Sequence, residues 1–115
     1  MLQCSGLVAI PSKPRLQFTP WKEGEGFFAS FNIVSQEPLK NKKNISQKIH
    51  HYQANMFVSK EKKEYWQKTI RPGEIFHMRT GDLSSVILEG YTNPISQIKI
   101  LEKNFLHLKQ PQWHA

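Results

Sequence analysis

The sequence predicts an all-β fold, a five-stranded Greek-key barrel with one short helix between the third and fourth strands. Two patterns favour this fold: short segments alternate apolar and polar residues at period two, and Gly- and Pro-rich turns separate them. One segment with helical spacing interrupts the series. A length of 115 residues suits a single domain. We expect this domain to span residues 1–108 and residues 109–115 to form a short polar tail.

The first strands are broken by proline. Gly6–Ile10 has the apolar, β-branched character of a strand, Pro11 and Pro14 interrupt it, and Arg15–Thr19 resumes it. Pro20–Gly26 is a predicted turn that carries Trp21. This tryptophan has little to pack against locally, so it either folds back onto the sheet or awaits a ligand or partner.

The next two strands alternate most clearly. Phe27–Ser35 places Phe31 and Ile33 on an expected core face. In Gln47–Val58 the apolar face consists of Tyr52, Ala54, Met56 and Val58. The opposite face is polar and uncharged, with a ring at each end: His51, Gln53, Asn55 and Phe57. Rings and amides on a sheet suit nucleotide bases, although an ordinary half-exposed strand with one stray Phe has the same pattern.

A helix is predicted over Ser59–Arg71, with Ser59 as its N-cap and Pro72-Gly73 as its end. Trp66 and Ile70 are four residues apart and should face the core together.

Two further strands complete the barrel. Glu74–Leu83 is the fourth strand, and Gly81 within it indicates a bulge or bend. A hairpin tip over residues 90–94 exposes Tyr91. The last strand closes with Ile98, Ile100, Phe105 and Leu108.

The charge balance favours an anionic partner. Sixteen Lys and Arg residues outnumber nine Asp and Glu, which gives a formal charge of +7. Such a field attracts nucleic acid, an anionic membrane or an acidic protein. Four lysines lie in one predicted loop without an acid among them: Lys40, Lys42, Lys43 and Lys48. This loop is either simply solvated or grips phosphates.

Other classes of protein find little support in the sequence. The single cysteine, Cys4, permits no intramolecular disulfide, which fits a reducing compartment. No signal-peptide pattern and no apolar run of the roughly 18 residues that a membrane span needs is present, so we expect a cytoplasmic protein without membrane contact. With one aspartate, scattered glutamates and no zinc-type His or Cys spacing, we expect no enzyme, no catalytic residues, no metal and no cofactor.

The order of these elements matches the oligonucleotide-binding fold (OB-fold), and the residues resemble bacterial-type single-stranded DNA-binding proteins (the SSB family). Leu7–Pro20, LVAIPSKPRLQFTP, is similar to the family's opening strand, and Phe27–Ser35 to its second strand. Tyr52–Leu83 is similar to its third strand, helix and fourth strand. The resemblance covers about residues 5–108.

The resemblance implies a binding site. A base-stacking aromatic late in the third strand falls on Phe57, and an earlier tryptophan on the same face falls on His51, a departure that offers less stacking area. Either the affinity is lower or another ring substitutes, with Trp21, Tyr91 and Phe28 as the candidates. The family's basic positions correspond to Lys13, Arg15, Lys40, Lys42, Lys43 and Lys48. Gln53 and Asn55 lie between the two rings of the third strand.

A second departure concerns the end of the chain. Family members usually end in a long tail with an acidic tip that recruits other proteins, whereas Lys109–Ala115 has no acidic side chain. We therefore expect a short accessory member from a plasmid, phage or other mobile element, or a primosome-type relative.

The expected function is binding of single-stranded DNA with little sequence specificity, in replication, recombination or transfer of DNA. We expect a homodimer or homotetramer, joined at an open barrel edge near Gly6–Ile10, with replication or transfer proteins as further partners. Two alternatives remain: a single-stranded RNA binder, or a protein-interaction adapter on the same barrel that uses Trp21, Tyr91 and Trp113.

Overall fold

The computed structural model describes residues 2–21, 25–35, 50–86 and 95–108. Within these ranges it contains seven strands and one α-helix. One short 3-10 helix directly precedes the α-helix, and a second lies between the last two strands. The strands are β1 (Leu2–Ala9), β2 (Gln17–Trp21), β3 (Gly26–Ser35), β4 (His50–Ser59), β5 (Ile75–Val86), β6 (Ile95–Leu101) and β7 (Phe105–Leu108). The helical segments are η1 (Lys60–Lys62), α1 (Lys63–Thr69) and η2 (Glu102–Asn104). None of these helices is long and apolar enough to cross a membrane.

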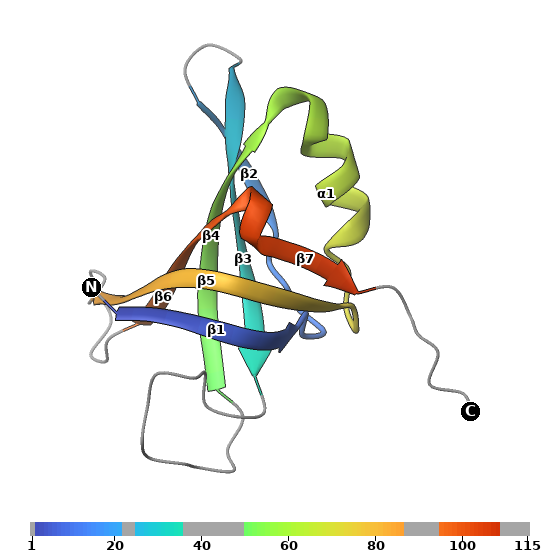
Figure 1. The fold of residues 1–115 in the computed structure, drawn as a ribbon. Helices are drawn as coiled ribbons and strands as arrows, with labels where there is room; N and C mark the ends of the chain where they lie inside the picture. Colours follow the sequence, from blue (N-terminus) through green and yellow to red (C-terminus); the bar gives the residue numbers. More distant parts are fainter. Residues whose placement is uncertain (1, 22–24, 36–49, 87–94, 109–115) are drawn as a thin grey trace.

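Five of the strands close into a barrel. Their order is β1-β3-β4-β6-β5, and β5 pairs again with β1. The β4–β6 pair is parallel and the other pairs are antiparallel. β1 and β5 cross in front of β3 and β4, and β2 extends the sheet beyond β3 (Figure 1). This topology, with α1 between β4 and β5, is that of an OB-fold, and it confirms the predicted five-stranded Greek-key barrel.

The barrel interior is filled by the faces that the alternation predicted. Phe31 and Ile33 of β3 are buried, as are Ala54, Met56 and Val58 of β4. Tyr52 is only partly buried and packs against the rim of the core. Because neighbouring residues of a strand point to opposite faces, burial of this set leaves Phe28, Asn55 and Phe57 on the outside of the barrel.

The helical segment covers one end of the barrel beside β7 (Figure 1). Trp66 and Ile70 are buried as predicted, and the Trp66 indole nitrogen donates a hydrogen bond of 2.6 Å to a carboxylate oxygen of Glu102. Phe76 and Phe105 stack beneath Trp66 with ring centroids 4.3 Å apart. Ser59 stands at the N-cap position before Lys60, as predicted, and its backbone is extended, but its side chain forms no capping hydrogen bond.

β5 carries the bulge that Gly81 indicated. Cys4 pairs with Gly81 but Gly6 pairs with Met78, so two steps along β1 match three along β5. The extra residue reverses the alternation, and both Met78 and Gly81 are therefore buried. At this point β5 leaves β7 and begins to pair with β6. A Cβ atom on Gly81 would lie 2.6 Å from Ile98 Cγ2, so the crowded core requires glycine here.

Two other boundaries differ from prediction. Trp21 ends β2, opposite Gly26, rather than lying in a turn, because the β2–β3 ladder continues to the tip. The last strand is divided by η2 into β6 and β7. This division turns the second half onto the β5 edge, where Phe105 is buried but Leu108 points outward and is exposed.

Candidate nucleic-acid interface

The outer face of β3, β4 and β6 carries the predicted third-strand site residues in three rows set by strand register. The first row contains Phe28, Phe57 and Leu101. The second contains Ser30, Asn55 and Lys99, and the third contains Asn32, Gln53 and Gln97. The face therefore changes from aromatic at one end to amide-rich at the other.

At the aromatic end three rings meet. Trp21, from the end of β2, lies 4.9 Å from Phe28 and 6.3 Å from Phe57 between ring centroids, and Phe28 lies 5.6 Å from Phe57. All three pairs are edge-to-face, with interplanar angles of 76° to 80°. Trp21 is 39% exposed and Phe57 40%. We call these three rings the outer aromatic cluster. Trp21 thus folds back onto the sheet, which is one of the two placements predicted for it.

Gly26 makes this arrangement possible. A Cβ atom on Gly26 would lie 2.5 Å from Cζ of Phe57 and 2.7 Å from the carbonyl oxygen of Val58. The Phe57 ring therefore rests against bare backbone of β3, and any side chain at Gly26 would displace it.

The amides of the third row hold one another across the strands. Gln97 donates its side-chain NH₂ to the Gln53 side-chain oxygen at 2.8 Å, and Gln53 donates to Ser30 Oγ at 3.0 Å. Asn32 donates to the carbonyl oxygen of Lys13 at 3.2 Å. These hydrogen bonds fix the spacing of β3, β4 and β6, so Gln53, a predicted site residue, has a structural role as well as a place on this face.

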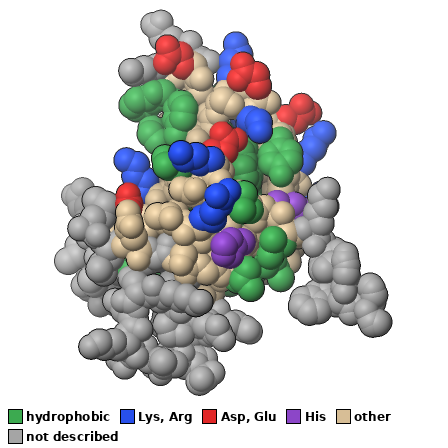
Figure 2. All heavy atoms as spheres, viewed as in Figure 1, with side chains coloured by type: hydrophobic (Ala, Val, Ile, Leu, Met, Phe, Trp, Pro, Cys, Tyr) green, Lys and Arg blue, Asp and Glu red, His purple; other side chains and the backbone are tan. Residues whose placement is uncertain are grey.

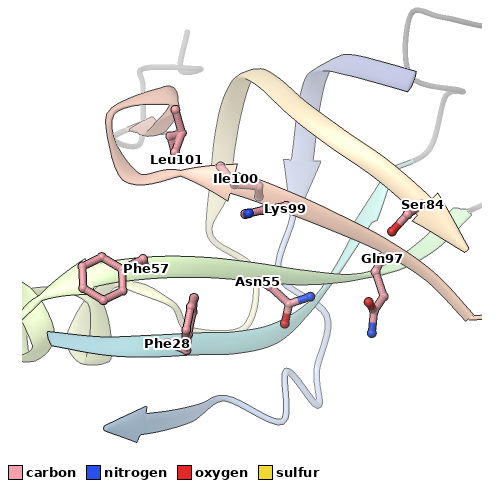
Figure 3. Close-up of a pocket in the computed structure, with 8 residues that line it drawn as sticks. All are labelled: Phe28, Asn55, Phe57, Ser84, Gln97, Lys99, Ile100 and Leu101. Atoms are coloured by element: carbon pink, nitrogen blue, oxygen red, sulfur yellow. The ribbon is translucent and has the colours of Figure 1, made fainter. Parts of the chain in front are cut away.

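Between the aromatic cluster and the amides the surface is hollowed. The hollow has a volume of about 230 Å³ and opens between β4 and β6. Phe28, Phe57 and Leu101 line one part of it, and Asn55, Gln97 and Lys99 line the polar part. Figure 3 shows the two rings at one end, Asn55 in the middle and Gln97 at the far end, with Lys99 approaching from β6. Neither Asn55 nor Lys99 forms a side-chain hydrogen bond or ion pair with the rest of the described chain.

Basic side chains flank this face. Lys13 and Arg15 are exposed in the segment between β1 and β2, where the Lys13 carbonyl is tied to Asn32. Lys13 and Arg15 therefore lie at the amide-rich end of the outer face. They are not part of a strand, whereas the resemblance implied that they would be. Arg15 has a positive φ of 52°, which turns the chain into β2. Asp82 of β5 lies opposite Lys99 in the same outward row.

The opposite side of the molecule is mixed in charge. Figure 2 views the barrel from the side of β1, β5 and β7, and most acidic side chains visible there lie over the half that carries α1, among lysines and arginines. Among the described residues, no three His, Cys, Asp or Glu side chains come close enough to hold a metal ion.

The structure does not unite all of the predicted residues. His51 is exposed on the same face as Phe57, but six residues along β4 separate them by about 20 Å. His51 therefore lies far from the outer aromatic cluster. Six predicted residues lie outside the described part of the chain: Lys40, Lys42, Lys43, Lys48, Tyr91 and Trp113.

Sequence reasoning missed Lys99, Gln97 and Leu101. Their signal was present, because the segment ISQIKIL alternates, and burial of Ile98 and Ile100 sends the three residues between and beside them outward. What the sequence did not contain was the parallel pairing that sets Lys99 beside Asn55.

Comparison with known proteins shows the fold. No protein-family model matches the sequence, and no curated protein matches it. Among solved structures, the chain is similar to the Plasmodium falciparum SSB in complex with single-stranded DNA, with a TM-score of 0.61 and 13% identity over 94% of this chain and 95% of that one. It is also similar to the single-stranded DNA-binding protein of Thermus aquaticus, with a TM-score of 0.50 and 12% identity. That match covers 94% of this chain but half of the Thermus chain. The barrel is thus SSB-like in fold.

Proposed function

We propose that the protein binds single-stranded DNA with little overall sequence preference. The observation that carries this proposal is the outer aromatic cluster. Three rings gather on the outer face of an OB barrel, and two of them are about two-fifths exposed. Solvent-exposed rings on a sheet stack with bases of any sequence, at about 1 to 3 kcal/mol per base.

The surrounding charge supplies the second part of the mechanism. Bases would stack on Trp21 and Phe57, while the backbone continues toward Lys13 and Arg15 at the amide end. We propose phosphate contacts also for Lys40, Lys42, Lys43 and Lys48, and further base contacts for His51 and Tyr91. Each phosphate contact should contribute a slope of about −0.7 to the dependence of log affinity on log salt.

The similarity in fold supports the proposal. The Plasmodium protein, which matches over nearly the whole length of both chains, was solved with single-stranded DNA bound. We propose the same class of ligand here, and membership of the bacterial-type SSB family. Its role would lie in replication, recombination or transfer of DNA in the cytoplasm, alongside proteins of those processes.

We further propose that the protein self-associates as a homodimer or homotetramer. Within the described residues β1 pairs with β3 only at Ala9, and this supports a role for the edge near Gly6–Ile10 in self-association. Four large apolar side chains point outward from β1, β5 and β7 nearby, each 37% to 57% exposed: Leu7, Ile75, Leu106 and Leu108. Sedimentation velocity over a range of concentrations should reveal this association, and a strictly monomeric protein would contradict it.

The same apolar surface favours a second candidate, a protein-interaction adapter. In that case Leu7 and Leu106 would contact a different protein, and oligonucleotide binding would be weak or absent. Single-stranded RNA is a variant of the first proposal, because stacking on rings does not distinguish the two sugars.

The test is a fluorescence anisotropy titration with labelled single-stranded DNA, single-stranded RNA and duplex DNA, each at two salt concentrations. We expect tight, salt-sensitive binding to single-stranded DNA and weaker binding to duplex. Absence of binding to single strands at low salt would overturn the proposal and leave the adapter as the remaining candidate.

A further inference from the structure

One pair of side chains in the hollow has no role in the fold. Asn55 and Lys99 are register partners on the adjacent strands β4 and β6, and both point outward. Their neighbours in the next row, Gln53 and Gln97, hydrogen-bond to each other, whereas Asn55 and Lys99 bond to none of the described side chains. Their donors and acceptor are therefore available to a ligand.

The hollow also offers a surface for a flat ring. The Phe28 and Phe57 rings stand at its apolar end, and Ile100 and Leu101 contribute further apolar lining. A base that stacks on the exposed Phe57 ring would direct its polar edge along β4 toward Asn55 and Lys99 (Figure 3). We infer that this hollow takes one pyrimidine base of the bound strand and that Asn55 and Lys99 hydrogen-bond to its edge. This inference rests on the proposed function.

The hydrogen-bonding pattern selects the pyrimidines. The Asn55 amide presents a donor beside an acceptor, and Lys99 presents donors only. Thymine has a central N–H between two carbonyl oxygens, so its N–H and one carbonyl satisfy the amide while the other carbonyl accepts from Lys99. Cytosine satisfies the same groups with the amide turned over, because its ring nitrogen accepts, its amino group donates and its carbonyl accepts from Lys99.

The purines leave a group unsatisfied. Adenine pairs its amino group and ring nitrogen with the Asn55 amide but offers a C–H where Lys99 needs an acceptor. Guanine can accept from Lys99 and donate its ring N–H to the amide oxygen, but its 2-amino group then faces the Asn55 NH₂, donor against donor. Adenine lacks the hydrogen bond that a pyrimidine carbonyl forms with the exposed Lys99, and guanine sets a donor against the half-buried Asn55 amide, so both purines should bind this hollow less well.

The experiment compares short single strands of thymidine with strands of 3-methylthymidine of equal length, by fluorescence anisotropy. The methyl group removes the central N–H and blocks the edge but keeps the ring face and the backbone charge. We expect the wild-type protein to bind the methylated strand at least about fivefold more weakly. In Asn55→Ala this ratio should fall toward one. The matched control Gln17→Ala, which removes an exposed amide of β2 outside the hollow, should keep the wild-type ratio.

A second arm tests Lys99. The ratio of the affinity for deoxycytidine strands to the affinity for deoxyadenosine strands should fall in Lys99→Met, because cytosine loses a hydrogen bond that adenine does not form. The strands' own stacking is the same for every protein variant and cancels in the comparison. Arg71→Met removes an equal charge from an exposed position beyond α1 and should leave the ratio unchanged.

The outcomes separate the inference from the proposed function. If the wild-type protein binds thymidine and 3-methylthymidine strands equally well, the edge contacts do not exist, yet single-strand binding stands. This comparison needs no variant and is independent of any effect of a substitution on folding. If the wild-type protein binds neither strand, both the proposed function and the inference are wrong.

Discussion

Two groups of aromatic rings on this barrel differ in their burial and in the geometry of their contacts, although both consist of Phe and Trp side chains. The inner group, Phe31, Trp66, Phe76 and Phe105, is at most 4% exposed, and its members are stacked or tilted against one another. The outer aromatic cluster contains no stacked pair, and its three contacts are all edge-to-face. An edge-to-face contact covers the face of only one of its two rings, and Trp21 and Phe57 remain 39% and 40% exposed.

The difference shows how one chain separates stability from binding. Met56 and Phe57 are consecutive residues of β4, yet the first is buried and the second is two-fifths exposed. Strand alternation sends one side chain into the core and the next to the surface. The inner rings stabilise the barrel by burial, and the outer rings hold open faces on a support that the inner rings have made rigid.

The largest expected effect on stability comes from a substitution in the inner group of rings. Phe76→Ala removes a fully buried ring that stacks on Phe105, and we expect the free energy of unfolding to fall by about 3 to 5 kcal/mol. Urea denaturation followed by circular dichroism measures this change. An unfolding free energy within about 1 kcal/mol of wild type would mean that the core is not packed as described.

A substitution at Gly26 should disturb the outer cluster from beneath. Gly26→Ala places a Cβ atom where the Phe57 ring and the Val58 carbonyl now lie, so the ring must move. We expect a loss of about 1 to 3 kcal/mol of stability from overpacking, together with weaker single-strand binding. Thermal denaturation and anisotropy titration of the same sample provide the two values. Gly73→Ala, whose Cβ atom would meet nothing within 4 Å, is the comparison for a glycine with open space, although its positive φ adds strain of its own.

Phe57→Ala should separate binding from stability most clearly. The Phe57 side chain is 40% exposed, so we expect the free energy of unfolding to fall by only about 1 kcal/mol through lost ring contacts. Affinity for single-stranded DNA should fall by about 1 to 3 kcal/mol, since one stacking surface is gone. Unchanged affinity in a folded Phe57→Ala variant would show that bases do not stack at this cluster.

The smallest effect concerns charge beside the hollow. Asp82 is the one acidic residue of β5 and stands opposite Lys99, where it opposes the approach of phosphate. Asp82→Asn should raise affinity for single strands by at most about 1 kcal/mol, and more at low salt than at high salt. Titrations at two salt concentrations measure this, and a loss of affinity would mean that Asp82 supports the site rather than opposing the ligand.

The sequence predicted the fold and named all three rings of the outer cluster as candidates, but it did not predict how they come together, for reasons that particular residues make clear. Alternation in Gln47–Val58 identified both faces of β4, and Gly81 marked the bulge of β5, because both signals are local. Trp21 was assigned to a turn because the ladder that carries it to Phe28 depends on pairing between strands. Lys99 was missed for the same reason, since its position beside Asn55 follows from the parallel β4–β6 pair and not from either segment alone.

The most direct test of the account is the tryptophan fluorescence of the wild-type protein and of Trp21→Phe during titration with single-stranded DNA. Trp66, which is buried and bonded to Glu102, and Trp113 are present in both proteins, so the difference between the two proteins reports on Trp21. The account predicts strong, salt-sensitive quenching in the wild-type protein and much less in Trp21→Phe. Equal quenching in both, or none in the wild type while anisotropy shows binding, would contradict the claim that the outer aromatic cluster binds bases.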